Sequence, residues 1–538
     1  MRQVNRWVTL GVLCLAVFTV MVATMLVNVL LPTLNRELNA DTRDLLWIVD
    51  GFNLVFAAFV LAAGSLSDRF GRKGALITGL GIYLTASVLS ATAPNAEVLI
   101  GWRALAGLGA AVVFPTTLSI ISNVFPDRSE RAKAIGLWGA ASGASVAIGP
   151  IIGGALAESS AWGAAFVFCA VVAGITMVLA VFFVPTSRDP AAPRLDFPGL
   201  ALSTLALGML VYTIIEGPER GWSSVTTLCD FGAAACLFLA FAIWENHVAQ
   251  PMLDVRLFTN LRFTAASGAV TMAFFALFGF IFLITQYFQL VLGWSPLESG
   301  VRVIPVATSV AIGSLIGVPL AVKLGTKLVV GAGLVSLSLA FLWVSTADAE
   351  TSYLVIVGQM VGIGLGMGFT SAPATEAIMG VVPAAKAGIG SAVNDATREL
   401  GGTLGVAVIG SVSLSVYRNT LADNVHDPAL LHSAQSSLGA AHVLAARIGD
   451  PSLAAVAQQG FLDGMGLGCI VAAAIGLFGA LLVAAFLPSH PVAPDVEPAE
   501  AEPAHVCSTC GGPIPPATPA PRPVGHLSTA LPALGVFP

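Results

Sequence analysis

The sequence contains few charged residues. Aspartate, glutamate, lysine and arginine make up 10% of its 538 residues, whereas 56% of the residues are hydrophobic. Soluble globular proteins carry about 25% charged residues. This scarcity excludes an ordinary soluble protein and indicates a chain that crosses a membrane several times.

Three further absences narrow the function. The net charge of −6 includes no basic block that could follow a phosphate backbone, so nucleic acid is not an expected partner. No G-x-x-x-x-G-K-[ST] sequence occurs, so no nucleotide is expected to supply energy. The seven histidines lie in loops and the tail, and the seven cysteines lack a regular spacing. We therefore expect neither an enzyme nor a protein with a cofactor or a metal.

Long apolar runs are abundant. A helix needs about twenty apolar residues to cross a bilayer, and windows of that length occur about fourteen times. The first run is too long for a signal peptide, so we keep it as a helix of the mature chain. The expected helices cover residues 8–31, 45–66, 75–93, 98–122, 134–157, 162–184, 197–215, 226–244, 263–288, 299–322, 328–345, 352–378, 387–416 and 461–487.

Lysine and arginine predict the orientation in the cell membrane. If the N-terminus is cytoplasmic, the outer loops hold only about six of these residues, which is a strong positive-inside bias. An even number of helices then places the C-terminus in the cytoplasm too. The residues on the cytoplasmic side are Arg2, Arg6, Arg69, Arg72, Lys73, Arg128, Arg131, Lys133, Arg188, Arg194, Arg256, Arg262, Lys323, Lys327 and Lys386.

The chain also resembles itself at an offset of about 254 residues. GSLSDRFGRK (64–73) is answered by VPLAVKLGTK (318–327), and RALAGLGAAVVFPTT (103–117) by VGIGLGMGFTSAPAT (361–375). Helix n therefore pairs with helix n plus eight. This arithmetic predicts two six-helix halves in parallel repeat with two helices inserted between them, an architecture typical of transporters.

These patterns predict four regions in an all-α membrane protein. Residues 1–184 form the N-terminal half, 185–250 the inserted helices, and 251–487 the C-terminal half with an outer loop at 417–460. Asp427-Pro428 and Asp450-Pro451 predict helix starts in that loop, and hence a short extracellular helical hairpin. Residues 488–538 are rich in proline and alanine and should form a disordered cytoplasmic tail.

The stretch GSLSDRFGRK is the most specific motif. Its glycines permit a tight turn and close helix approach, and an acid faces three basic residues near the membrane surface. A solvated basic loop that only enforces topology is the alternative. The spacing resembles the loop between helices two and three of the major facilitator superfamily, where it is understood as a conformational latch. Its residues are Gly64, Asp68, Arg69, Gly71, Arg72 and Lys73.

Two further stretches resemble motifs of the same superfamily. LIGWRALAGLG (99–109) matches a fourth-helix pattern, with Arg103 and Gly107 in place. SVAIGPIIGGAL (145–156) is similar to the antiporter motif of the fifth helix. Its small residues at intervals of four let a neighbouring helix approach closely, although tight packing without any coupling role would need the same residues. The matching positions are Gly149, Pro150, Gly153 and Gly154, with Ser145 replacing a glycine.

From Trp7 to Leu487 the chain resembles the fourteen-helix drug:proton antiporters of the QacA type (EmrB/QacA-like). The resemblance implies multidrug efflux: export of lipophilic, often cationic small molecules, driven by the proton gradient and in contact with membrane lipids. Two departures stand out, because Ala23 and Ser309 occupy positions where relatives carry acids. A proton-coupled exporter of one endogenous metabolite, lipid or antibiotic would share every motif. A polytopic membrane enzyme is much less compatible with the sequence.

The remaining ionisable groups within the apolar runs are few. Asp50 lies in WIVDGFNLVF, and Asp395 and Glu399 stand four residues apart in VNDATREL. Such groups are rare at membrane depth and usually face a cavity or a partner. We assign substrate and proton coupling to these three acids and Arg103. The alternatives are an Arg398–Asp395 ion pair, an Asp50 that reaches the outer headgroups, and an Arg103 that only tethers helices.

Overall fold

The computed structural model describes residues 5–187, 196–248, 251, 255–381 and 387–488. The tail beyond Pro488 lies outside these residues, so its expected disorder is not addressed. Within the described residues the chain forms only helices and their connections.

Fourteen long helical segments occupy the described residues when α10 and α11 are counted together, and each expected apolar run overlaps one of them, extending past its ends by no more than about two residues. They are α1 (Arg6–Glu37), α2 (Thr42–Phe70), α3 (Arg72–Ala91), α4 (Ala96–Val124), α5 (Arg128–Ser159), α6 (Gly163–Phe183), α7 (Phe197–Arg220), α8 (Val225–His247), α9 (Leu261–Gln286), α10 (Pro296–Arg302) with α11 (Ile304–Leu324), α12 (Thr326–Val344), α13 (Tyr353–Val381), α14 (Ala387–Asn424) and α17 (Pro451–Phe486).

Thirteen of these segments are long and apolar enough to cross a membrane. The other is α2, which has 29 residues and includes the charged residues Arg43, Asp44 and Asp50. It packs against α4, α7 and α14. Its length and position in the bundle are therefore those of the other spanning helices.

The helix packing repeats between the two parts of the chain. In the N-terminal part α1 packs on α5, α2 on α4, α3 on α4 and α3 on α6. In the C-terminal part α9 packs on α14, α11 on α13, α12 on α13 and α12 on α17. The turns repeat as well, since Gly71 and Gly325 end α2 and α11 with φ of 117° and 92°, a backbone region that favours glycine.

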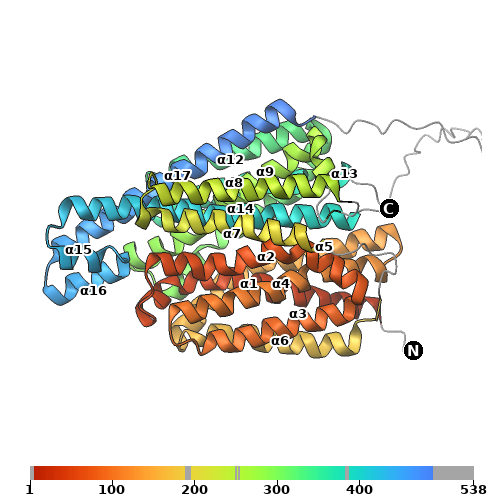
Figure 1. The fold of residues 1–538 in the computed structure, drawn as a ribbon, viewed down its shortest axis with the longest axis horizontal. Coiled ribbons are helices and arrows are strands. Elements are labelled where there is room, and N and C mark those ends of the chain that lie inside the picture. Colours follow the sequence, from red (N-terminus) through yellow and green to blue (C-terminus); the bar gives the residue numbers. More distant parts are fainter. Residues whose placement is uncertain (1–4, 188–195, 249–250, 252–254, 382–386, 489–538) are drawn as a thin grey trace, which may run out of the picture. The chain divides into compact units, whose positions relative to one another are not determined.

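Two main contacts join these six-helix groups, which we call the N-half and the C-half, and smaller ones include those of α1 with α9, α10 and α16. The first main contact is between α2 and α14, and the second is between α5 and the α10–α11 segment. The inserted helix α7 packs on its partner α8 and also on α2 and α14. In Figure 1 the red and orange helices of the N-half lie together, and yellow α7 lies between them and blue-green α14.

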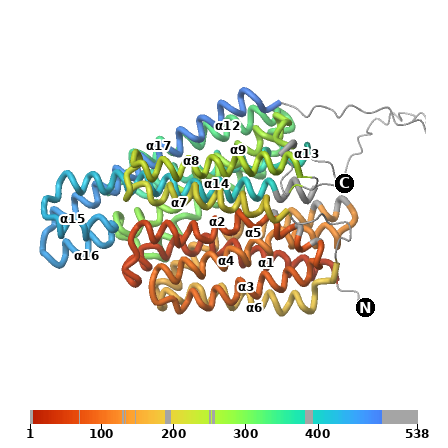
Figure 2. Tube along the Cα trace, in the orientation of Figure 1, coloured from red at the N-terminus to blue at the C-terminus, as the bar shows by residue number. Residues whose placement is uncertain are grey.

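The predicted helical hairpin is present, but it is shorter than the predicted loop. α14 continues to Asn424 and α17 begins at Pro451, because these helices extend beyond the apolar runs. Asp427 caps α15 (Pro428–Ala434), α16 (Leu438–Ile448) follows, and Asp450 caps α17 rather than a hairpin helix. Figure 2 shows α15 and α16 at one end of the bundle, which we call the hairpin end. The opposite end, where α1 begins and α2 ends, is the motif end.

Candidate functional site

Helices α2 and α14 run antiparallel along the boundary between the halves. Their contact near the hairpin end is fixed by Leu46, because its side chain occupies the space that a Cβ at Gly410 would need. Asp50 and Asn53 follow Leu46 by one and two turns on the same side of α2. At about 100° per residue, both fall within about 40° of Leu46, so they point toward α14.

The acids of α14 share the face that meets α2. Counted at about 100° per residue, Asp395, Glu399 and Thr403 fall within about 60° of Gly410. A rise of 1.5 Å per residue places Asp50 about 10 Å nearer the hairpin end than Glu399. The sequence-predicted acids therefore form two facing stripes at different depths, one from each half.

The polar groups of the α2 stripe have few partners. Asp50 is fully buried, and neither of its carboxylate oxygens has a hydrogen-bond partner among the described residues. The side-chain amide of Asn53 likewise lacks a partner in this part of the chain. Buried polar groups are normally paired, and exceptions mark places where water, an ion or a ligand is bound. The complete burial of Asp50 does not fit a carboxylate that reaches the headgroups.

Hydrogen bonds of residues beside the α14 stripe link it to α13. Asn394 Nδ2 donates to Asp395 Oδ1 at 3.5 Å, and Thr375 Oγ1 of α13 donates to Asn394 Oδ1 at 3.1 Å. Arg398 Nη2 donates to Thr375 Oγ1 at 3.0 Å, and the guanidinium lies 5.3 Å from the centre of the Phe274 ring. Among the ion pairs of the described residues, none joins Arg398 to Asp395.

Arg103 is fastened to α2. Its Nε donates to the backbone carbonyl of Ile48 at 3.1 Å, and its guanidinium lies 4.4 Å from the centre of the Phe52 ring. The two helices approach closely because Gly107 lies against the backbone of Phe52. These contacts correspond to helix tethering, two residues away from Asp50 along α2.

The GSLSDRFGRK stretch (64–73) lies at the motif end. Lys73 Nζ donates to the carbonyl of Val181 at 2.7 Å, and the backbone N–H of Arg72 donates to Ser187 at 2.9 Å. Arg69 lies 5.8 Å from the ring of Phe70. The side chain of Asp68 lies outside the described residues. The described basic residues of the motif thus contact the end of α6 and their own loop.

The antiporter motif makes two different contacts. A methyl group at Gly153 would lie 2.9 Å from the carbonyl oxygen of Leu26, and one at Gly149 would lie 2.8 Å from Met25 Cβ. These two glycines, with buried Ser145, therefore pack α5 against α1 within the N-half. Gly154 instead lies against the backbone of Pro296 in α10, which belongs to the C-half.

The halves are joined by hydrogen bonds at the hairpin end. Asn35 Nδ2 donates to Ser437 Oγ at 2.7 Å, and the N–H of Thr42 donates to the Ser436 carbonyl at 2.9 Å. On the other side of the bundle, the N–H of Leu297 donates to Glu158 Oε1 at 3.1 Å. Gln289 Nε2 also donates to the Val29 carbonyl at 2.8 Å, about two turns inside α1, so the hydrogen bonds between the halves that join described residues lie at or near this end.

Sequence reasoning missed a charge network at the hairpin end. It joins α2, α7, α8 and α14 through Arg43, Glu216, Glu219, Arg220, Asp230 and Arg418. The available signal was EGPER (216–220), which places three charges in the last turn of an apolar helix. A cleft of about 370 Å³ between α17 and the turn that follows α12 also lies at this end, and its lining includes Asp348 and Asp463 but none of the predicted site residues.

The repeated helix packing and the two facing polar stripes define a membrane transporter of the two-half type. The sequence comparisons give its family. Residues 13–406 match the Major Facilitator Superfamily, to which this chain belongs. This confirms the predicted family and places the chain among transporters, not enzymes, as a multi-pass membrane protein.

Curated relatives match most of the chain. The multidrug efflux pump LfrA of Mycolicibacterium smegmatis is 34% identical, with 89% of this chain and 95% of LfrA covered. The multidrug resistance protein Stp of Mycobacterium tuberculosis is 32% identical, with coverage of 86% and 88%. The methyl viologen resistance protein SmvA of Salmonella typhimurium is 32% identical, with coverage of 76% and 82%.

Solved structures confirm the fold. A bacterial homologue of the human lysosomal transporter Spinster superimposes with a TM-score of 0.65 at 18% identity, covering 90% of this chain and 98% of that one. The nucleoside transporter NupG superimposes with a TM-score of 0.57 at 12% identity, covering 89% and 100%.

Proposed function

We propose that the chain is a multidrug efflux antiporter that exports lipophilic, often cationic, compounds across the cell membrane in exchange for protons. Relatives named as multidrug efflux and resistance proteins match most of its length, and SmvA is named for resistance to methyl viologen, a dication. Membership of the family supports the transport activity, whereas the proposed proton coupling rests on the acidic residues at the boundary between α2 and α14, which we call the seam.

The facing acid stripes carry the proposal. Asp50 of the N-half has no hydrogen-bond partner in the part of the chain that the structure describes, and Asp395 and Glu399 of the C-half line the opposite face. A carboxylate in such a place holds a proton or a lipophilic cation more easily than both together. Binding of one therefore disfavours the other, which is the coupling that antiport needs.

The proposed orientation places both termini in the cytoplasm and the hairpin end outside. The lysine and arginine distribution supports this orientation. The halves, residues 1–184 and 251–487, then rock about the seam, while residues 185–250 accompany them. A reporter fused after Leu487 should read as cytoplasmic, and an external signal would contradict the orientation.

Dye efflux is the direct test. Cells that express the chain should lose a fluorescent cationic dye faster than control cells, and a protonophore should abolish the difference. Asp50→Asn should weaken export of cationic dyes more than of neutral ones. Asp395→Asn combined with Glu399→Gln should abolish substrate-induced proton release from purified protein. Undiminished proton release from that double variant would remove these acids from the mechanism.

A matched control comes from α17. Asp463 accepts a hydrogen bond from Gln459 at 2.8 Å and lines the cleft at the hairpin end. Asp463→Asn removes one acid from the same protein without touching either stripe. Export and proton release should be unchanged in this variant, so a loss there would indicate a general effect of charge rather than the proposed coupling.

A narrower substrate range is the second candidate. Two further relatives are named for single antibiotics: the methylenomycin A resistance protein of Bacillus subtilis, 33% identical, and the tetracenomycin C resistance and export protein of Streptomyces glaucescens, 29% identical. A panel of chemically unrelated cations and antibiotics separates the two candidates, since export of one compound alone would favour the narrow range.

A further inference from the structure

The inserted helix pair occupies a special place in the bundle. α7 and α8 belong to neither repeat, yet α7 packs on α2 of the N-half and on α14 of the C-half. These are the helices that face each other along the seam. Any motion that separates the halves at the hairpin end must therefore change the contacts of α7 with one of them.

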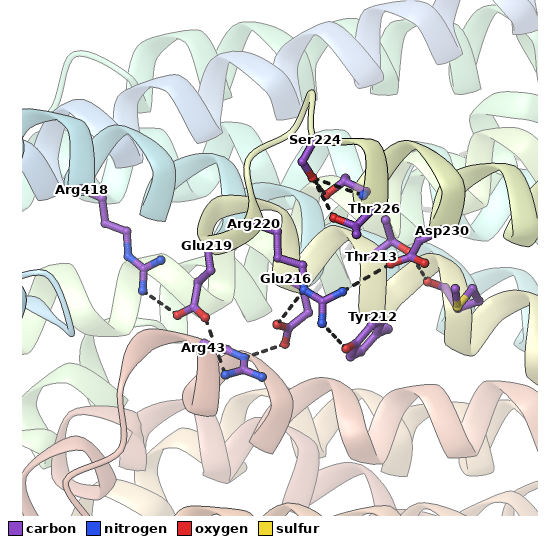
Figure 3. A network of polar contacts seen from close by, with 12 residues as sticks. Arg43, Tyr212, Thr213, Glu216, Glu219, Arg220, Ser224, Thr226, Asp230 and Arg418 are labelled. Atoms are coloured by element: carbon purple, nitrogen blue, oxygen red, sulfur yellow. Dashed lines mark hydrogen bonds and ion pairs between the residues drawn. The ribbon is translucent and has the colours of Figure 1, made fainter.

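On the side of the N-half, α7 is joined to the start of α2. Arg43 Nε lies 2.6 Å from Glu216 Oε1, and Arg43 Nη1 lies 3.7 Å from Glu219 Oε2 (Figure 3). The side chain of Glu216 is only 5% exposed. One turn along α2, the Trp47 ring packs on Tyr212 at 6.3 Å between centres.

On the side of the C-half, the same end of α7 is joined to α14. Arg418 Nη2 lies 2.9 Å from Glu219 Oε1. Beyond the turn, Trp222 Nε1 donates to Ser415 Oγ, one turn before Arg418 on α14, at 3.1 Å. Glu219 thus forms an ion pair with an arginine of each half through a different oxygen, and among the described residues it is the one carboxylate that does so.

The network is balanced in charge. Arg220 lies 3.6 Å from Glu216 and 3.4 Å from Asp230 of α8 and also contacts Tyr212, so three arginines face three carboxylates. Removing the charge of Glu219 leaves three positive groups facing two negative ones in a partly buried place. Arg43 and Arg418 would then repel each other across the seam instead of sharing a partner.

We propose that Glu219 clasps the two halves together through Arg43 and Arg418, so that the inserted helix pair stabilises the state closed at the hairpin end. The insertion thereby acts on the conformational equilibrium of the transporter and not on its substrate site. The inference rests on rocking of the halves, and it requires neither a particular substrate nor proton coupling.

Amide hydrogen exchange of the purified full-length protein, without substrate or gradient, tests the clasp. The readout is the N–H of Leu297, which bonds to Glu158 across the other contact between the halves. Glu219→Gln and Arg418→Gln should each speed its exchange about tenfold, which corresponds to about 1.4 kcal/mol in the closed–open equilibrium. Because both variants break the same pair, the double variant should exchange no faster than about the faster single variant.

Asp230→Asn is the matched control. It removes a carboxylate of the same network whose ion pair, among the described residues, is with Arg220 of the neighbouring helix. Its exchange at Leu297 should stay within about twofold of the parent protein. The clasp is refuted if both single variants exchange like the parent, or if Asp230→Asn speeds exchange as much as they do. Arg418→Lys, which keeps the charge, should retain most of the protection. These exchange measurements do not depend on transport, so they would test the clasp even if the chain did not export dyes.

Discussion

The neighbouring glycines Gly153 and Gly154 of α5 should respond differently to the same substitution. A methyl group at Gly153 would press on Leu26 of α1, a helix of the same half. A methyl group at Gly154 would lie 2.6 Å from Leu297 Cα of α10, a helix of the other half. The first clash is present in every state of the transporter, whereas the second exists only while the hairpin end is closed.

The magnitude follows from the packing. An added methyl group that meets backbone atoms costs about 1–3 kcal/mol. The gain of about 0.5–1 kcal/mol from replacing a helical glycine by alanine applies to both states and cancels from their ratio. Gly154→Ala should therefore shift the equilibrium away from the closed hairpin end by about 5- to 140-fold. Gly153→Ala should lower thermal stability and leave that equilibrium unchanged.

Exchange of the Thr42 amide reads out the shift at a distance. This N–H bonds to Ser436 of the hairpin, on a contact that does not involve α5. Its exchange should accelerate in Gly154→Ala but not in Gly153→Ala. Gly143→Ala is the control on the same helix, because a methyl group there has no neighbour within 4 Å. Equal acceleration in the two neighbouring variants would refute the division of α5 contacts between the halves.

Three further outcomes can be checked independently. Ser309→Asp should not create a cation site, because Ser309 Oγ donates to the Pro305 carbonyl at 2.6 Å and Ser309 Cβ lies 2.5 Å from where a methyl group at Gly364 would be. The substitution should instead destabilise the protein by about 1–3 kcal/mol in thermal unfolding. An enhanced preference for cationic dyes would refute this. Asp68→Asn should slow export of all substrates alike in efflux assays if the motif governs the conformational cycle, whereas selective loss of one substrate would contradict that role. Hydrogen bonds from the Ser452 side chain and backbone hold the pKa of Asp450 below its usual value. The cap that Asp450 provides on α17 therefore stabilises the protein above about pH 4 and is lost as the pH falls further. The Asp450→Asn variant keeps the cap but cannot titrate, so its free energy of unfolding should fall less on acidification than that of the parent, and equal losses would contradict this.

The helices and their pairing were predictable because they depend on apolar runs and on an internal repeat, both of which can be recognised in the sequence itself. Membrane helices need long apolar runs, and the offset between Gly71 and Gly325 revealed the repeat that the helix packing follows. The ends were less accurate where a helix continues past its apolar run into water. α14 extends to Asn424 for this reason, and its extra turns carry Arg418.

The candidate site was only partly predictable. The acids Asp50, Asp395 and Glu399 could be selected because charges in apolar runs are rare, but their facing arrangement depends on the contact of Leu46 with Gly410, which no local pattern contains. Arg418 and Glu219 are 199 residues apart in the sequence, and their ion pair joins the inserted helix α7 to α14 of the C-half. An internal repeat predicts contacts within each half, but it has no counterpart for an inserted helix.

The clasp and the two acids of α14 should act independently, because they are far apart on this helix. Arg418 lies nineteen residues beyond Glu399, or about 28 Å along the helix. Substitutions at such distances usually add. Glu219→Gln should therefore speed exchange of the Leu297 amide by the same factor in the parent protein and in the Asp395→Asn/Glu399→Gln background, while proton release remains abolished in the latter. If neutralising the two acids cancels the effect of Glu219→Gln in the absence of substrate, the acids themselves determine whether the hairpin end is open or closed. Proton coupling and closure of the hairpin end would then depend on the same residues.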